Sequence, residues 1–103
     1  MANNFSISGR HVEVTDALDE YARNKLSKLD TIFKNITTVH VILSIDNLQQ
    51  KAEGEVKIAG DQKSIFAESS TEDMYKSIDE LEHKLLTQVR KYHSILTDHH
   101  KGK

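Results

Sequence analysis

The chain has 103 residues, of which 37% are hydrophobic and 29% are charged, and its formal net charge is −2. This length predicts one small domain with a single modest core and leaves little chain for a second lobe or a deep active-site cleft. Cysteine is absent and no run approaches the ~18 apolar residues of a membrane span, so we expect a cytoplasmic protein with no disulfide, thiolate metal site, signal peptide or membrane partner.

The N-terminal residues predict a strand followed by a helix. Phe5 and Ile7 alternate with serines, which indicates a short strand. A helix is expected over 16–33, and both Thr15 and Asp16 are suitable N-caps for it. Its apolar residues recur at helical spacing and form one stripe: Leu18, Tyr21, Ala22, Leu26, Leu29, Ile32 and Phe33.

The middle of the chain predicts three strands. Residues 37–45 alternate between apolar and polar side chains, as expected for a strand with one buried face. The polar segment 47–54 is predicted to be a loop that leads into a strand at 55–59. Residues 60–63 carry a turn signal, and 64–69 form the last predicted strand.

A second long helix is predicted after this strand. Ser70 or Thr71 is its expected N-cap, with Glu72 and Asp73 in the first turn. Its apolar stripe consists of Met74, Ile78, Leu81, Leu85, Val89 and Tyr92. Residues 1–95 are therefore expected to form one domain, and residues 96–103 are expected to form a flexible polar tail.

The predicted order of elements is β-α-β-β-β-α, which is an α+β fold. Short connections between the last three strands predict an antiparallel meander. Each helix has a single apolar stripe, so both helices are expected to pack side by side on one face of a four-stranded sheet.

Charge is distributed unevenly along this weakly acidic chain. Residues 46–82 contain ten acidic residues and four basic ones, whereas 84–103 contain five basic residues and one acidic residue. On a helical projection, Lys25 falls within the apolar stripe of the first helix, and Lys28 lies at its edge. Lys84 and Lys91 lie along one flank of the stripe of the second helix. If the helices are adjacent, these four lysines are expected to border one groove that suits a phosphate backbone.

Simpler explanations exist for some of these cations. Lys25 can lay its aliphatic stem over apolar surface and keep its ammonium in water. Cations near a helix C-terminus complement the helix dipole, which accounts for Arg90 and Lys91. The dipole accounts poorly for Lys84 in the middle of the helix, and it does not account for the alignment of Lys84 with Lys91.

Enzymatic interpretations have less support. The histidines His93, His99 and His100 lack a cysteine or carboxylate at ligand spacing, so no metal site is predicted. No glycine-rich phosphate loop and no nucleophile motif is present. The acidic residues of the middle segment are most simply a solvated face, although a carboxylate pair for acid–base chemistry stays open. We therefore expect no enzyme activity, no cofactor and no small-molecule substrate.

Two stretches resemble a known family: "ISGRHVEVTDAL…Y…KLSKLD" (7–30) and "EDMYKSIDELEHKL…Q…RK" (72–91). The chain is similar to the bacterial ribosome hibernation-promoting factors, also called ribosome-associated inhibitors or sigma-54 modulation proteins. The resemblance extends from Phe5 to about His93. It implies a β-α-β-β-β-α fold related to double-stranded-RNA-binding domains.

The resemblance also implies a function. Members of this family bind the small ribosomal subunit in the mRNA and tRNA channel, at the A and P sites, and block translation sterically. Their helix lysines match Lys25 and Lys28 in the first helix and Lys84 and Lys91 in the second. The family commonly has an arginine at the position of Thr87. Two further residues are expected to add rRNA contacts: Arg90 and Arg10.

The length of the chain resembles the short form of the family, which promotes storage of inactive ribosome dimers in stationary phase. A related inhibitor with a longer tail silences ribosomes but opposes dimerisation, and it stays as the alternative. A second alternative is a protein–protein adaptor without an RNA role that uses its acidic sheet face. The protein is expected to be monomeric away from the ribosome.

Overall fold

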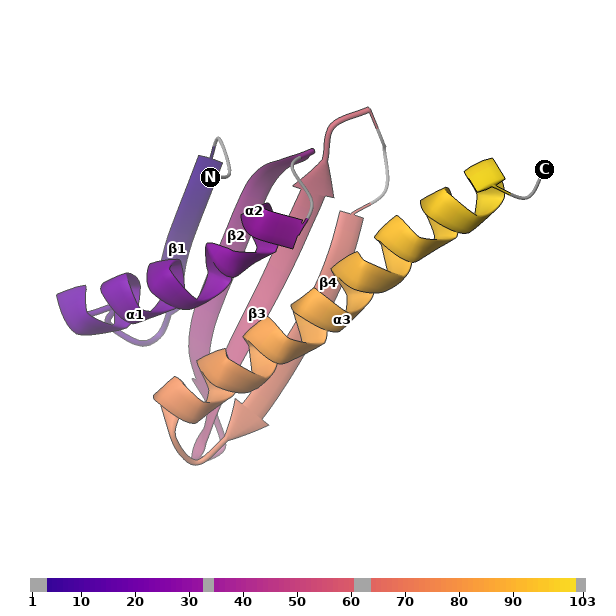
Figure 1. Cartoon of the computed structure of the whole chain (residues 1–103). Helices are drawn as coiled ribbons and strands as arrows, with labels where there is room; N and C mark the ends of the chain where they lie inside the picture. Colours follow the sequence, from indigo (N-terminus) through magenta and orange to yellow (C-terminus); the bar gives the residue numbers. More distant parts are fainter. Residues whose placement is uncertain (1–3, 33–34, 61–63, 102–103) are drawn as a thin grey trace.

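The computed structural model describes residues 4–32, 35–60 and 64–101 (Figure 1). The elements are β1 (Asn4–Arg10), α1 (Asp16–Leu26), α2 (Lys28–Ile32), β2 (Ile36–Asp46), β3 (Gln49–Ile58), β4 (Ser64–Thr71) and α3 (Met74–Lys101). The predicted α+β class and order of strands and helices are confirmed, with the first predicted helix divided into α1 and α2. Within the described residues, no helix is both long enough and apolar enough to span a membrane.

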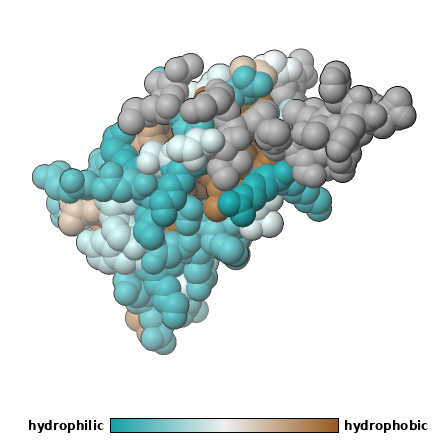
Figure 2. Space-filling view, in the orientation of Figure 1, coloured by the Kyte–Doolittle hydropathy of each residue, from teal (hydrophilic) through white to brown (hydrophobic). Residues whose placement is uncertain are grey.

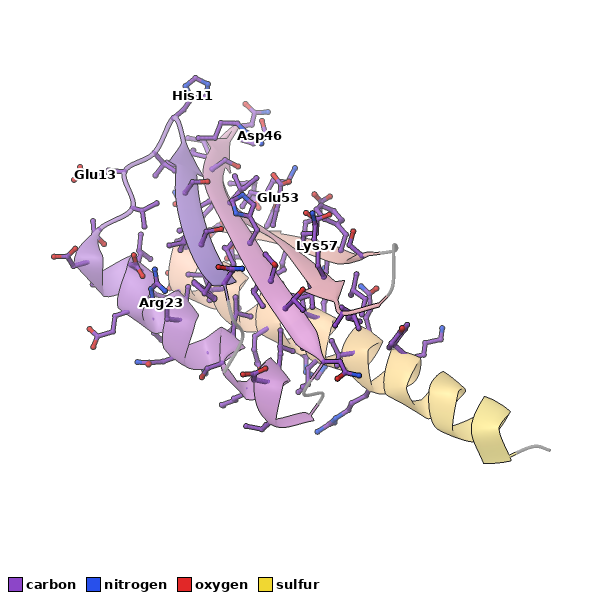
Figure 3. The ribbon with its side chains drawn as sticks, turned by 90° about the horizontal axis from the view of Figure 1, so that it is seen from above. His11, Glu13, Arg23, Asp46, Glu53 and Lys57 are labelled. Carbon is purple, nitrogen blue, oxygen red and sulfur yellow. The ribbon has the colours of Figure 1, made fainter. Side chains whose placement is uncertain are left out.

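The four strands form one mixed sheet in the order β1-β2-β3-β4. β1 pairs with β2 in parallel, because α1 and α2 provide the crossover that a parallel pair requires. β2, β3 and β4 pair antiparallel, as the short connections predicted. The helices cover one face of this sheet, and the opposite face is open (Figures 1 and 3).

The core lies between the sheet and the helices. Both predicted apolar stripes contribute fully buried side chains, such as Leu26 from α1 and Leu85 from α3. On β2, Val39, Val41 and Leu43 face the helices, because alternate side chains point to one side of a strand. This packing holds α1 over β1 and β2, and α3 over β3 and β4.

The predicted helix over 16–33 is interrupted at Ser27. Thr15 caps α1 as expected, since its side chain accepts a hydrogen bond from the Leu18 amide. At the other end the Ser27 hydroxyl donates to the Asn24 carbonyl oxygen, and a hydroxyl that bonds to nearby backbone competes with the regular helix. Lys28 therefore begins a separate short helix, α2, and Phe33 lies outside the described residues.

The prediction of a loop at 47–54 is wrong, because β3 begins at Gln49. Asp46 pairs with Gln49 across a two-residue turn, in which both Asn47 and Leu48 have positive φ. The small side chain of Ala52 and the glycine at 54 supply the buried face here, so the strand lacked the large apolar residues that identify one. Gly54 permits close packing, since a Cβ there would lie 2.9 Å from Leu85 Cδ1.

The second long helix also differs from the expectation at both ends. It begins at Met74, and Asp73 caps it by accepting a hydrogen bond from the Tyr75 amide at 3.0 Å. Thr71, an expected cap, instead accepts from the Asp73 amide in the corner before the helix. The backbone of α3 continues to Lys101, which includes most of the segment 96–103 expected as a tail; Gly102 and Lys103 lie outside the described residues.

Candidate nucleic-acid interface

The helix layer is electrostatically polarised because α1 and α3 run in the same direction (Figure 1). Acidic residues occur in the first turn of α1 and basic residues in its last turn, an order that complements the dipole of α1. In α3 the acidic residues at 79–82 are preceded by Lys76 and followed by further basic residues. The acidic residues are Asp16, Asp19, Asp79, Glu80 and Glu82, and the basic residues that follow them are Arg23, Lys25, Lys84, Arg90 and Lys91.

Lys25 lies in the seam between α1 and α3. Its Nζ is 3.4 Å from Asp79 Oδ1, and its side chain is 32% exposed. The same carboxylate oxygen accepts a hydrogen bond from the Tyr21 hydroxyl at 2.6 Å, and the Lys25 ammonium lies 5.6 Å from the Tyr21 ring centroid. Asp79 therefore offsets the charge of Lys25. The sequence pattern did not reveal this pairing.

Tyr21 connects the two helices in a second way. Its ring meets the ring of Tyr75 edge to face, with the centroids 4.9 Å apart. The hydrogen bond to Asp79, followed by burial, raises the pKa of Tyr21 from 10.0 to about 12. The neutral phenol is therefore favoured in the folded protein, and it fixes the relative position of α1 and α3.

Lys84 lies on the other flank of α3, over the edge strand β4. Its Nζ donates to the carbonyl oxygen of Glu68 at 2.9 Å, and the amide of Gln88, one turn later, donates to the carbonyl oxygen of Phe66 at 2.9 Å. These bonds satisfy backbone acceptors that an edge strand leaves unpaired. An ammonium has three N–H donors, so Lys84 retains two for a phosphate.

The expected groove bordered by four lysines is not what the structure shows. Lys25 faces α3 from the α1 side, whereas Lys84 points away from α1 towards β4, so α3 lies between them. Lys91 follows Lys84 by seven residues and shares its flank, and Lys28 is exposed at the start of α2. The lysines therefore belong to one broad helix-bearing face, which Figure 2 shows as largely hydrophilic, rather than to one trough.

Several exposed cations of this face have no acidic partner among the described side chains. Among the described side chains, none forms an ion pair with Lys28, Lys84, Arg90 or Lys91, and all four residues are exposed. Lys25 and Arg23, by contrast, are each paired with an aspartate. These four residues carry available positive charge on the helix side of the molecule, and we call Lys28, Lys84, Arg90 and Lys91 the basic face.

Arg10 does not join the basic face. Its guanidinium lies 3.8 Å from Glu53 Oε2, and Glu53 projects from β3 on the open side of the sheet (Figure 3). The sheet therefore separates Arg10 from the lysines of α2 and α3. A strand-end position in the sequence did not indicate on which face this side chain would lie.

The structure adds neighbours that the sequence did not single out. Lys76 and His83 are exposed on the outer surface of α3, next to Lys84. Thr87, where the resemblance led us to expect an arginine, is exposed on the same helix, and its hydroxyl donates to the carbonyl oxygen of His83. Their helical spacing from Lys84 could have indicated from the sequence that these residues lie near it on α3.

The acidic sheet face is extensively paired. Lys51 Nζ lies 3.3 Å from Glu68 Oε1 and 3.7 Å from Glu53 Oε2, and these carboxylates raise the pKa of Lys51, chiefly through the hydrogen bond with Glu68. Glu55 accepts a hydrogen bond from Ser64 at 2.8 Å. This face is therefore a network of opposite charges and hydroxyl groups rather than an uncompensated negative surface.

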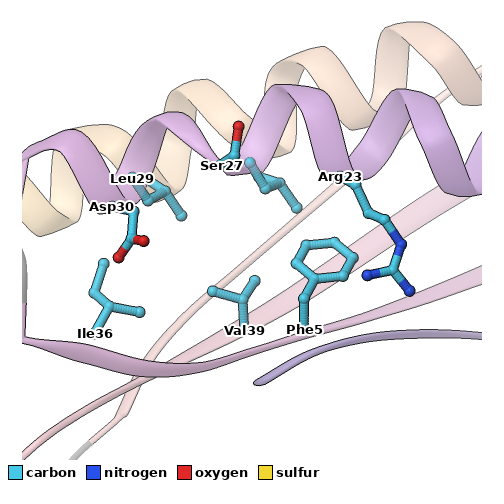
Figure 4. A pocket seen from close by; sticks show the side chains of 8 residues that line it. Phe5, Arg23, Ser27, Leu29, Asp30, Ile36 and Val39 are labelled. Atoms are coloured by element: carbon cyan, nitrogen blue, oxygen red, sulfur yellow. The ribbon is translucent and has the colours of Figure 1, made fainter. Parts of the chain in front are cut away.

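A small cavity lies between the α1–α2 segment and the strands β1 and β2 (Figure 4). Its volume is about 80 Å³, and its lining is mainly apolar. Arg23 closes one end by placing its guanidinium 4.8 Å from the Phe5 ring centroid, and buried Asp30 lies at the other end. Sites for small organic ligands typically span ~300 Å³ or more, so this cavity does not provide one.

Histidine and carboxylate side chains do not gather into a metal site in the described part of the chain. No group of three or more such residues is placed to hold an ion there. The structure does not describe the side chains of the three histidines considered as metal ligands in the sequence, which are His93, His99 and His100.

The chain resembles proteins of one family in sequence and in structure. A family model described as sigma 54 modulation protein / S30EA ribosomal protein matches residues 5–97. The ribosome hibernation promoting factor of Pseudomonas putida is 42% identical over 87 residues, which cover 84% of this chain and 83% of that protein. Its counterpart from Escherichia coli is 33% identical over 94 residues, which cover 91% of this chain and 97% of that protein.

Two solved structures share the fold. A ribosomal subunit interface protein from Coxiella burnetii superposes with a TM-score of 0.81 and 33% identity, covering 88% of this chain and 98% of that one. The N-terminal domain of Thermus thermophilus Protein Y gives a TM-score of 0.76 and 31% identity, covering 87% of this chain and 98% of that one. With the match over residues 5–97, these likenesses establish that the chain belongs to the sigma 54 modulation protein / S30EA ribosomal protein family.

Proposed function

We propose that this protein is a ribosome hibernation factor that binds the small ribosomal subunit and contacts its rRNA through the basic face. Its relatives named ribosome hibernation promoting factor support this proposal, as does its structural likeness to a ribosomal subunit interface protein. The action is steric and non-enzymatic: the bound protein occupies the mRNA and tRNA channel at the A and P sites and thereby blocks translation.

One observation carries the assignment of the surface. Lys84, Arg90 and Lys91 are exposed on α3 and have no acidic partner among the described side chains, although the whole chain is slightly acidic. Phosphate contacts provide most of the affinity for nucleic acid and need such available cations. Lys25 is a weaker contributor in this account, because Asp79 already offsets its charge.

The finer role is supported by the relatives named ribosome hibernation promoting factor, of which the match covers 83% and 97%. We propose that the protein promotes storage of inactive ribosome dimers in the cytoplasm during stationary phase, and that it is monomeric away from the ribosome. The related inhibitor, which silences ribosomes but opposes dimerisation, is the other candidate. Sucrose-gradient profiles of stationary cells with and without the protein distinguish the two candidates. Loss of the protein removes the ribosome-dimer peak only if the protein promotes dimerisation.

Occupancy of the channel has a direct biochemical test. Purified small subunits are mixed with the labelled protein, and tRNA with a short mRNA is then added in increasing amounts. Displacement of the protein by tRNA and mRNA is expected, together with weaker binding as the salt concentration rises, because released counterions drive phosphate contacts. Salt-insensitive binding that tRNA does not displace would instead favour the protein–protein adaptor.

A further inference from the structure

Unusual backbone conformations occur together at the end of the molecule that carries the β2–β3 turn. Three described non-glycine residues have positive φ: His11 at 63°, Asn47 at 56° and Leu48 at 72°. His11 lies in the connection from β1 to α1, and Figure 3 places it beside Asp46, which immediately precedes the turn. All three conformations are therefore found at one end of the sheet.

Leu48 is the unexpected residue of this group. Two-residue hairpin turns with positive φ favour asparagine and glycine, whereas a bulky side chain is strained there. Asn47 follows this preference, but Leu48 does not. The leucine is 87% exposed, so packing within the chain does not compensate for its strain, and Ile45 nearby is 45% exposed. Strained backbone of this kind is found preferentially at sites of function.

We propose that Ile45 and Leu48, which we call the hairpin tip, dock into an apolar socket on a protein of the small ribosomal subunit. This inference rests on the proposed function and adds to it a contact of different chemistry. The basic face would bind rRNA, and the hairpin tip would make an apolar contact with a neighbouring ribosomal protein.

The charges around the hairpin tip favour a protein over RNA as its partner. Asp46 is exposed immediately before the turn, and Glu72 and Asp73 are exposed in the corner between β4 and α3. This corner lies close to the turn, because Thr71 pairs with Gln50 across β3 and β4. Two cations, Arg10 and Lys51, also lie near Ile45, but both are paired with Glu53. Carboxylates repel a phosphate backbone but suit lysine and arginine side chains, so the complementary socket is apolar with a basic rim.

The first test compares two turn variants in binding to purified small subunits. Leu48→Gly removes the aliphatic side chain and relieves the positive φ, so it is expected to raise the melting temperature while weakening binding about 10-fold or more, as for loss of one buried leucine side chain. Asn47→Gly is the matched control, because it changes the same turn but keeps Leu48. Its binding is expected to equal that of the wild type.

The second test identifies the partner by crosslinking. A photo-crosslinking amino acid at position 48 is expected to label a ribosomal protein when the full-length protein is bound to small subunits. Labelling of rRNA, or unchanged affinity of Leu48→Gly, would overturn the inference while leaving the proposed function intact. Failure of the wild-type protein to bind small subunits would overturn both.

Discussion

The hydroxyl of Tyr21 in α1 donates a 2.6 Å hydrogen bond to Asp79 in α3, and this bond joins α1 to the helix that carries most of the basic face. It also raises the pKa of Tyr21 to about 12, above the ordinary value of 10.0. Because the folded-state pKa is the higher one, the bond stabilises the fold fully below pH 10, and its contribution is lost as the pH rises towards 12.

We therefore predict that Asp79→Asn lowers the pKa of Tyr21 towards 10. A spectrophotometric titration of phenolate absorbance measures this change, and Tyr21→Phe identifies which transition belongs to Tyr21. In the wild type, the transition that Tyr21→Phe removes should lie at about pH 12. A Tyr21 transition near pH 10 would show that the bond between the helices does not persist in solution.

A second prediction adds charge to the basic face. Thr87→Arg supplies the basic side chain that the family resemblance led us to expect here, at an exposed position whose hydroxyl bonds to the His83 carbonyl oxygen. Binding to small subunits should become several-fold tighter, and the logarithmic salt slope should steepen by about one phosphate contact. Affinity measurements at two or more salt concentrations test this.

Thr87→Gln is the matched control for that substitution, because it lengthens the side chain without adding charge. It should bind like the wild type. If Thr87→Arg leaves both the affinity and the salt slope unchanged, this part of α3 does not face phosphates in the complex.

A third prediction concerns the connection between β1 and α1. A Cβ at Gly9 would lie 2.1 Å from the carbonyl oxygen of Val12, so an alanine would force the backbone of this connection to move. Gly9→Ala should lower the free energy of unfolding by about 1–3 kcal/mol, the usual cost of overpacking. Chemical denaturation followed by circular dichroism measures the change, and an unaltered midpoint would contradict the close approach.

The sequence predicted the fold wherever large apolar residues mark an element. The stripes of α1 and α3 and the alternation in β2 identified the core directly. β3 was missed over its first residues because Ala52 and Gly54 form the buried face there. Ser27 did not reveal the helix break, because a serine occurs within many continuous helices and acts here through local hydrogen bonds.

The candidate interface was predicted in composition but not in geometry. Helical spacing correctly grouped Lys84 with Lys91, yet it could not show that this flank faces the edge strand rather than α1. That direction depends on which strands α3 covers, a tertiary property. The pairing of Lys25 with Asp79 was equally hidden, because the two residues are brought together only when the helices pack.

The most direct test of the account is co-sedimentation of charge-reversal variants with purified small ribosomal subunits at low salt. Lys84→Glu with Lys91→Glu reverses the basic face, whereas Arg10→Glu with Lys57→Glu makes the same change in charge on the open side of the sheet. Circular dichroism confirms that each variant is folded. We predict that binding of the first pair falls about 100-fold or more and that the second pair binds like the wild type; full binding by the first pair would contradict the assignment of the basic face.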